Sequence, residues 1–312
     1  MYTQDEIRQL VQDVLSGYLD EGRHPAEGRH PDAVRISDAV RISAEGRHPD
    51  AVRISPRVDP GEAPDVTAVS TKDEFHVPSP ANRQGYLDMK QTTVARIGVW
   101  RAGARYNTMS MLHFRADHAT AQDAVFTDVD PEFVKAQGFV EGQTLCTSKD
   151  EFLTRPDLGR KLDDDTRTKF KSQLRTGAPV TIMVGDGLSS SAMVNVPDVL
   201  PAIVQGLKSS GIEIGPVPFV KYCRVGAMDD LVPLLNTDVV CLLIGERPGL
   251  ATGESMSAYM AYRPSADKPE SWRTVVSNIY RGGTPPAEAG AYVATLIRKI
   301  LDEKVSGVDL HL

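Results

Sequence analysis

An acid and an arginine stand directly after an apolar run in this sequence. The run from Val239 to Ile244 has the length and composition of a strand that is buried on both faces. It must end at Gly245-Glu246-Arg247-Pro248-Gly249, because the proline lacks a backbone donor and the glycines allow tight turns. Ligands bind at the carboxyl ends of strands in open α/β sheets, so Glu246 and Arg247 are candidate binding residues. The alternative is that the two side chains are solvated or paired with each other.

A second candidate is the loop Gly185-Asp186-Gly187-Leu188-Ser189, which follows a predicted strand over 180–185 and precedes a predicted helix. Backbone N–H groups at such a position can hold a phosphate. The loop has neither the G-x-G-x-x-G fingerprint of dinucleotide-binding proteins nor a Walker lysine. A tight turn capped by serines is the other interpretation.

The sequence does not predict a complete catalytic centre. Gly187-Leu188-Ser189-Ser190-Ser191 lacks the last glycine of a nucleophile elbow, and the only later histidine is His311, which excludes a serine hydrolase of that type. The cysteines are far apart and form no C-x-x-C pair, and no base, nucleophile and orienting partner occur together. We therefore predict no catalytic residue and no metal ligand, and expect a binding surface for chemistry done elsewhere.

Composition narrows the class of protein further. The 312 residues carry a net charge of -7, which argues against a nucleic-acid binder because such a protein needs a basic face. The longest apolar runs are far shorter than the ~20 residues that span a bilayer, and the first residues lack a secretory signal. Isolated cysteines fit a reducing compartment. We expect a soluble cytoplasmic protein that binds neither nucleic acid nor membrane.

The elements that would position these loops alternate along the second half of the chain. Strands are predicted over 180–185, 217–223 and 239–244, with 256–262 as a further candidate, and helices over 197–210 and 228–235. A last helix is predicted after Thr284 and Pro285, with its end at Gly307. This alternation predicts an α/β fold with a parallel sheet over residues 171–312.

The first half of the chain does not show this alternation of predicted strands and helices. Residues 1–18 have the spacing of a short amphipathic helix, and residues 86–170 are predicted to be mostly helical. Between them, 19–85 is predicted to be a flexible, disordered linker, because it is rich in Pro, Gly and charge. Its sequence AEGRHPDAVRIS occurs at 26–37 and again at 44–55, which indicates a tandem duplication. The histidines repeated there lack a rigid frame for binding a metal.

Six segments, in this order, resemble the small (light) subunit of ethanolamine ammonia-lyase over roughly residues 90 to 312. They are Phe152-Leu153-Thr154-Arg155-Pro156-Asp157-Leu158-Gly159-Arg160, Gly185-Asp186-Gly187-Leu188-Ser189, Phe219-Val220-Lys221-Tyr222-Cys223-Arg224-Val225, Gly245-Glu246-Arg247-Pro248-Gly249-Leu250, Ser277-Asn278-Ile279 and Gly282-Gly283-Thr284-Pro285-Pro286. Each segment is short, but six in register are highly specific.

The resemblance implies a subunit of an adenosylcobalamin enzyme that converts ethanolamine to acetaldehyde and ammonia by a radical mechanism. In that family the large subunit holds ethanolamine, and a Rossmann-like domain of the small subunit covers the cobalamin. Three cobalamin contacts of the family map onto Val225, Glu246 and Val275. Some relatives have cysteine where this chain has Val275, so a backbone contact would survive there and a thiol contact would not.

The resemblance does not extend to the duplicated linker. A docking helix on a tether resembles the cargo peptides of enzymes packed into bacterial microcompartments, so we expect a location in the cytoplasm or within such a compartment. A non-catalytic nucleotide- or phosphate-binding α/β module that uses the Asp186–Ser191 turn remains the alternative. Cobalamin bound by the complex would favour the lyase, and affinity of the lone chain for simple nucleotides would favour the module.

Overall fold

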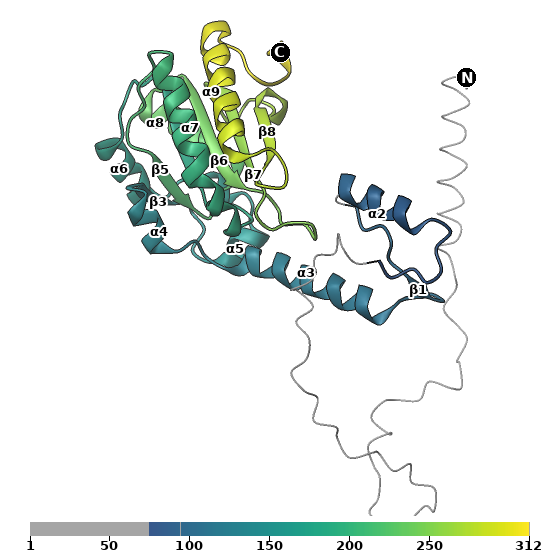
Figure 1. The fold of residues 1–312 in the computed structure, drawn as a ribbon. Coiled ribbons are helices and arrows are strands. Elements are labelled where there is room, and N and C mark those ends of the chain that lie inside the picture. The colour runs from purple at the N-terminus through teal and green to yellow at the C-terminus, as the bar shows by residue number, and fades with distance from the viewer. Residues whose placement is uncertain (1–74, 94, 312) are drawn as a thin grey trace, which may run out of the picture. The chain divides into compact units, whose positions relative to one another are not determined.

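The computed structural model describes residues 75–93 and 95–311 (Figure 1). The predicted helix over 1–18 and most of the predicted linker over 19–85 lie outside these residues. No helix in the described ranges is both long and apolar enough to cross a bilayer.

Helices and a small hairpin make up most of the described chain before β4. Helix α2 (Arg83–Thr92) begins at Asn82 and α3 (Thr108–Phe126) at Asn107, because each asparagine side chain accepts a hydrogen bond from the first helical turn. Strands β1 (Arg101–Ala102) and β2 (Arg105–Tyr106) pair as a two-stranded antiparallel hairpin. Three further helices follow: α4 (Pro131–Ala136), α5 (Lys149–Thr154) and α6 (Asp164–Gln173).

The centre of the fold is a mixed six-stranded sheet with the order β3-β5-β4-β6-β7-β8. The first four strands in this order run parallel, and β7 and β8 run antiparallel to their neighbours. Their bounds are β3 Val140–Gln143, β4 Val180–Gly185, β5 Pro218–Lys221, β6 Val239–Gly245, β7 Met256–Tyr262 and β8 Thr274–Ile279.

The prediction of a parallel sheet is right for β4, β5 and β6, and wrong for the further candidate strand over 256–262, which forms β7 and runs antiparallel to β6. The loop from Glu246 to Ser255 between β6 and β7 contains no helix, and a parallel pair needs a crossover of about a dozen residues or more, usually helical. The chain therefore turns back instead of crossing over. Strands β3 and β8 were not predicted. Because β3 joins the sheet at Val140–Gln143, residues on both sides of the predicted boundary at 170/171 contribute to it.

Helices cover both faces of the sheet (Figure 1). Helices α7 (Val196–Ser209) and α9 (Pro286–Glu303) pack on one face, and their apolar side chains form one core with alternate residues of the strands, among them Ile182, Cys241 and Met260. Helices α6 and α8 (Leu231–Leu235) pack on the opposite face, where the core includes Phe170, Leu231, Met183 and Leu242. We call this second side the α6–α8 face.

Candidate ligand-binding site

The connections of the chain reverse direction between β4 and β6. From β4 the chain passes to β5 on one side, and from β5 it passes to β6 on the other side of β4. Such a reversal, at the carboxyl ends of two adjacent parallel strands, is the usual place for a ligand in an open α/β sheet. The two loops that the sequence singled out, after Gly185 and after Gly245, both begin here.

Glycines let these two loops pack against each other. The N–H of Leu188 donates to the carbonyl of Gly245 at 3.2 Å. A Cβ on Gly187 would lie 2.5 Å from the Gly245 carbonyl oxygen, and one on Gly245 would overlap the Ser189 carbonyl oxygen. The contact therefore requires residues without side chains.

Two serine hydroxyls hold the carboxylate of Glu246. Ser255 Oγ donates to Oε2 at 2.7 Å, and Ser257 Oγ makes a shorter hydrogen bond to Oε1. The half-buried side chain thus lies against the start of β7, and the carboxylate forms no ion pair with Arg247 or any other described residue. An ionised carboxylate has about four acceptor sites, so two remain for a ligand.

The three mapped residues share the α6–α8 face of the sheet. Val225, the first residue of the 3-10 helix η4 (Val225–Asp230), packs against the core on that face. Ser257, which holds Glu246, pairs with Ile244 of the same core, and directly opposed residues of antiparallel strands project from one face. Val275 pairs with Tyr259, which also packs there, and its side chain is 43% exposed. The tertiary structure thus brings residues 225, 246 and 275 onto one surface.

Arginines surround the η4 part of this surface. Burial lowers the pKa of Arg224, and the nearby positive charges of Arg247 and Arg160 lower it as well. Arg160 lies over Gly226, since a Cβ there would meet its side chain at 3.0 Å. Arg273 Nη2 donates to both carboxylate oxygens of Asp229, at 2.9 and 3.0 Å, which ties the end of η4 to the start of β8. The arrangement suits a ligand that carries an anionic group beside an apolar body.

The loop from Gly185 to Ser191 is poorly suited to phosphate. The N–H groups of Asp186, Leu188 and Ser190 already donate to the carbonyls of Val220, Gly245 and Ala124. Asp186 is only 1% exposed, and neither carboxylate oxygen has a hydrogen-bond partner among the described residues. Burial raises the pKa of Asp186 to about 6, against the opposing charge of Lys149 at 4.0 Å. These features favour a packed turn over a phosphate loop.

Ser255, Ser257 and Tyr259 were not predicted from the sequence as residues of the site. Ser255 and Ser257 alternate at the start of the candidate strand over 256–262, so the spacing placed both hydroxyls on one side. Their partner could not be inferred, because β7 was not known to pair with β6. Burial and the charge of Glu246 raise the pKa of Tyr259, which marks its position near that carboxylate.

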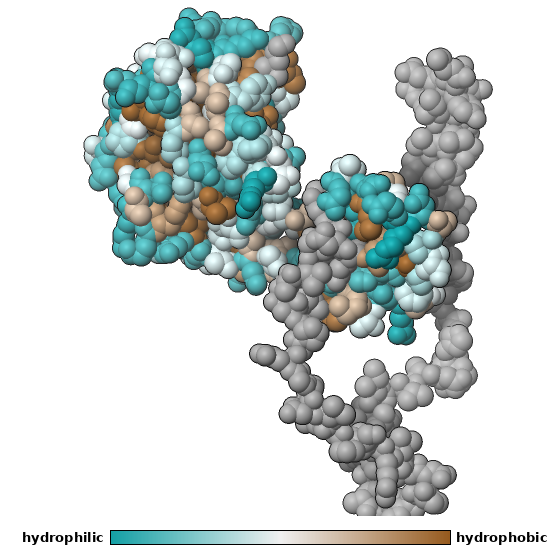
Figure 2. Space-filling model, in the orientation of Figure 1, coloured by the Kyte–Doolittle hydropathy of each residue, from teal (hydrophilic) through white to brown (hydrophobic). Residues whose placement is uncertain are grey.

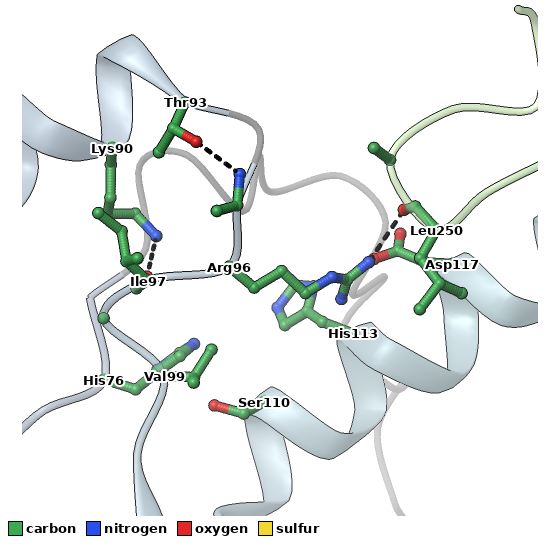
Figure 3. A pocket seen from close by; sticks show the side chains of 13 residues that line it. His76, Lys90, Thr93, Arg96, Ile97, Val99, Ser110, His113, Asp117 and Leu250 are labelled. Atoms are coloured by element: carbon green, nitrogen blue, oxygen red, sulfur yellow. Dashed lines mark hydrogen bonds and ion pairs between the residues drawn. The ribbon is translucent and has the colours of Figure 1, made fainter. Parts of the chain in front are cut away.

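A cavity of about 160 Å³ lies apart from these residues, between α2, α3 and the loop at Leu250 (Figure 3). The guanidinium of Arg96 bridges its wall: it pairs with Asp117 and donates to the Leu250 carbonyl at 2.9 Å. His113 is buried and lines the cavity, whereas His118 is exposed. The cavity contains none of Val225, Glu246 and Val275.

These features define an α/β protein with a ligand surface at the carboxyl edge of its sheet. The model of the family described as ethanolamine ammonia-lyase light chain (EutC) matches residues 83–311. The chain belongs to this family.

Curated proteins with high sequence identity to this chain belong to the same family. The ethanolamine ammonia-lyase small subunit of Listeria monocytogenes is 54% identical over 251 residues, which is 80% of this chain and 86% of the relative. The small subunit of Clostridium perfringens is 55% identical over 248 residues (79% and 84%), and that of Clostridioides difficile is 54% identical over 247 (79% and 84%).

Proposed function

We propose that this chain is the small subunit of an adenosylcobalamin-dependent ethanolamine ammonia-lyase. It forms a cofactor site together with a large subunit, in the cytoplasm or within a bacterial microcompartment. The observation that carries the proposal is the placement of Val225, Glu246 and Val275 on one face of the sheet, with the Glu246 carboxylate fixed at the point where the connections reverse. The four parallel strands with helices on both faces act in it as a Rossmann-like cobalamin-binding domain.

The residues present fit the cofactor. Cobalamin has a broad apolar macrocycle fringed by amides, and a phosphodiester in its nucleotide tail. Val225 and Val275 offer apolar contact, the free acceptor sites of Glu246 suit amide or hydroxyl donors, and Arg160 and Arg247 suit a phosphate.

In this proposal the chain's own residues bind and shield. The serine hydroxyls keep Glu246 in one position before the cofactor arrives, and the glycine contact between the loops keeps that edge rigid. The bound cofactor supplies the radical chemistry by which ethanolamine becomes acetaldehyde and ammonia. The sequence predicts no nucleophile, base and orienting partner together in this chain, so in this proposal the large subunit provides the substrate site.

Co-purification tests the proposal. The chain, co-expressed with an ethanolamine ammonia-lyase large subunit, should elute with it in one peak, and that peak should carry the absorption spectrum of cobalamin after incubation with adenosylcobalamin. The complex should form acetaldehyde from ethanolamine, and the purified chain alone should not. Turnover by the lone chain, or a complex that binds no cobalamin, would contradict the proposal.

A further inference from the structure

Arg273 and Asp229 form a buried ion pair between two distant parts of the chain. Their side chains are 6% and 12% exposed, and Arg273 Nη2 donates to both carboxylate oxygens of Asp229. Glu270, which is 64% exposed, also contacts the guanidinium. Removing two charges from water costs energy that apolar residues of similar size would not, so such a pair is a weak source of stability. Two directed hydrogen bonds do, however, fix one position of the two segments relative to each other.

One partner lies beside Val275. Arg273 has an extended backbone and directly precedes β8, so alternation along the strand places its side chain on the same face as that of Val275. Burial raises the pKa of Tyr259, the charge of Glu246 raises it further, and that of Arg273 lowers it. Tyr259, which opposes Val275 on β7, therefore lies near both charges. Arg273 thus belongs to the α6–α8 face, next to residues of the proposed site.

The other partner lies on η4, the 3-10 helix that begins with Val225. The last residue of this helix, Asp230, accepts a hydrogen bond from the Leu162 N–H at 2.9 Å and pairs with Arg167 of α6 at 2.6 Å. These contacts fix η4 against α6 but leave its distance from β8 to other interactions.

The Asp229–Arg273 pair fixes that distance. In the part of the chain that the structure describes, no other hydrogen bond or ion pair joins η4 to residues 270–279. Val225 and Val275, the two apolar residues mapped onto the site, thus lie on segments that this pair connects. A change in the length of the pair therefore moves one valine relative to the other.

We propose that Arg273 and Asp229 are positioning residues for the cofactor: the length of their ion pair sets the separation of Val225 and Val275, and thereby the fit of this surface to the cobalamin macrocycle. This inference rests on the function proposed above. A rigid ligand cannot adapt to a surface that is too wide or too narrow, so a spacing fixed in advance contributes affinity. The competing interpretation is that the pair only stabilises the fold, in which case a change in its length would leave cofactor affinity unaltered.

Conservative variants change the length of the pair and keep both charges. Asp229→Glu makes the acid longer by a single bond, and Arg273→Lys makes the base shorter by a single bond. Each variant, in the full chain assembled with the large subunit, should weaken binding of adenosylcobalamin roughly tenfold, within the coupling expected of residues in one salt-bridge network. The double variant keeps the total length, and its affinity should return to within about threefold of the wild type.

A control that lowers stability separates fit from folding. On the side seen in Figures 1 and 2, α7 and α9 cover the opposite face of the sheet, and hydrophilic and apolar atoms are interspersed over this surface. Leu207 of α7 is fully buried beneath it. Leu207→Ala leaves a cavity there, so it should lower the melting temperature at least as much as the length variants do. It should still bind adenosylcobalamin like the wild type.

Cofactor titration and thermal unfolding, on complexes that elute with the large subunit, give the outcome. Normal affinity of the single variants, or losses that multiply in the double variant, overturns the proposal. An equal loss of affinity in the Leu207 variant reduces the effect to stability and also overturns it. If a single variant does not fold, Asp229→Asn takes its place because it keeps the shape of the side chain, and normal affinity there again overturns the proposal. A wild-type complex that binds no cobalamin overturns the proposed function instead.

Discussion

The central strands and the edge strand β8 of the sheet differ in how completely they are covered. Every residue of β4 and β6 is buried, with α7 and α9 on one face and α6 and α8 on the other. On β8 only Ile279 is buried, and Val275 is open to solvent. The covered strands β4, β6 and β7 form the rigid base of the site, and the edge strand β8 offers surface that a ligand can cover.

This difference in burial explains how the Glu246 side chain can be held in one position and still be accessible to a ligand. Glu246 follows the last parallel strand but is held by serines from the first antiparallel one. Its position is thus fixed by the covered strands β6 and β7, while it shares the α6–α8 face with the exposed Val275 of the open edge strand β8. Substitutions in the covered strands should chiefly affect stability. Substitutions at Glu246, at the border between the covered strands and the open edge, should chiefly affect ligand affinity.

The largest effect is expected for Gly245→Val in the covered half. The new side chain would overlap the Ser189 carbonyl oxygen, and backbone cannot move aside cheaply, so the free energy of unfolding should fall by about 3 kcal/mol or more. Urea denaturation measures this. Gly249→Ala is the control, because its Cβ would meet nothing within 4 Å and should change stability by less than about 0.5 kcal/mol. Equal stability of the two variants would contradict the tight loop contact.

A pH-dependent effect is expected for Asp186→Asn. Burial raises the pKa of Asp186 to about 6, so the folded state favours the protonated acid. Its contribution is fully present below pH ~4 and is lost as the pH rises through about 6, a change of about 3 kcal/mol. The free energy of unfolding of the asparagine variant should lack this loss when measured by urea denaturation between pH 4 and 7.

Asp150→Asn serves as the control for this variant, since it removes an exposed acid beside Lys149. Its pH profile should follow that of the wild type. If Asp186→Asn and the wild type gave parallel profiles, the buried carboxylate would not titrate in this range and the expectation would be wrong.

At the border between the two halves, Glu246→Gln should lower the affinity of the complex for adenosylcobalamin roughly tenfold to a hundredfold. A hydrogen bond with one charged partner contributes about 1.5–3 kcal/mol. Titration of the cofactor-free complex measures the affinity, and its melting temperature should change little. Glu254→Gln, an exposed acid in the same loop, is the control. A Glu246 variant with unaltered affinity but lower stability would give this residue a structural role only.

The smallest effect is expected for removal of Met1 to Glu74, which should leave turnover of the assembled complex nearly unchanged. The cut is placed there because the Phe75 ring packs at a tilt against the Tyr86 ring, with centroids 5.4 Å apart, and the His76 backbone N–H donates to the Gly98 carbonyl at 3.0 Å. Removal of Met1 to Pro80 deletes both contacts and should lower the melting temperature of the chain. Acetaldehyde formation and thermal unfolding, measured for both truncations, separate the outcomes. A large loss of turnover with the shorter truncation would show that the N-terminal segment takes part in the reaction.

Much of the local structure follows from the sequence alone. The strands at 180–185 and 256–262 have the predicted bounds, and the run over 239–244 forms β6 with one more residue. Burial of a strand on both faces requires an uninterrupted apolar run, and Gly and Pro end the strand. The position and length of such a strand can therefore be predicted from residues that are adjacent in the sequence. Glu246 is predicted as a binding residue for the same reason, as the acid that follows such a run.

Only the tertiary structure decided the direction of β7 and β8, the addition of β3, and the meeting of Val225, Glu246 and Val275 on one face. The short polar strand β3 becomes a strand only by pairing with β5, and the partial exposure of β8 leaves no continuous apolar run to detect. Strand pairing joins residues far apart in the chain, and its energy depends on neighbours that local periodicity does not identify.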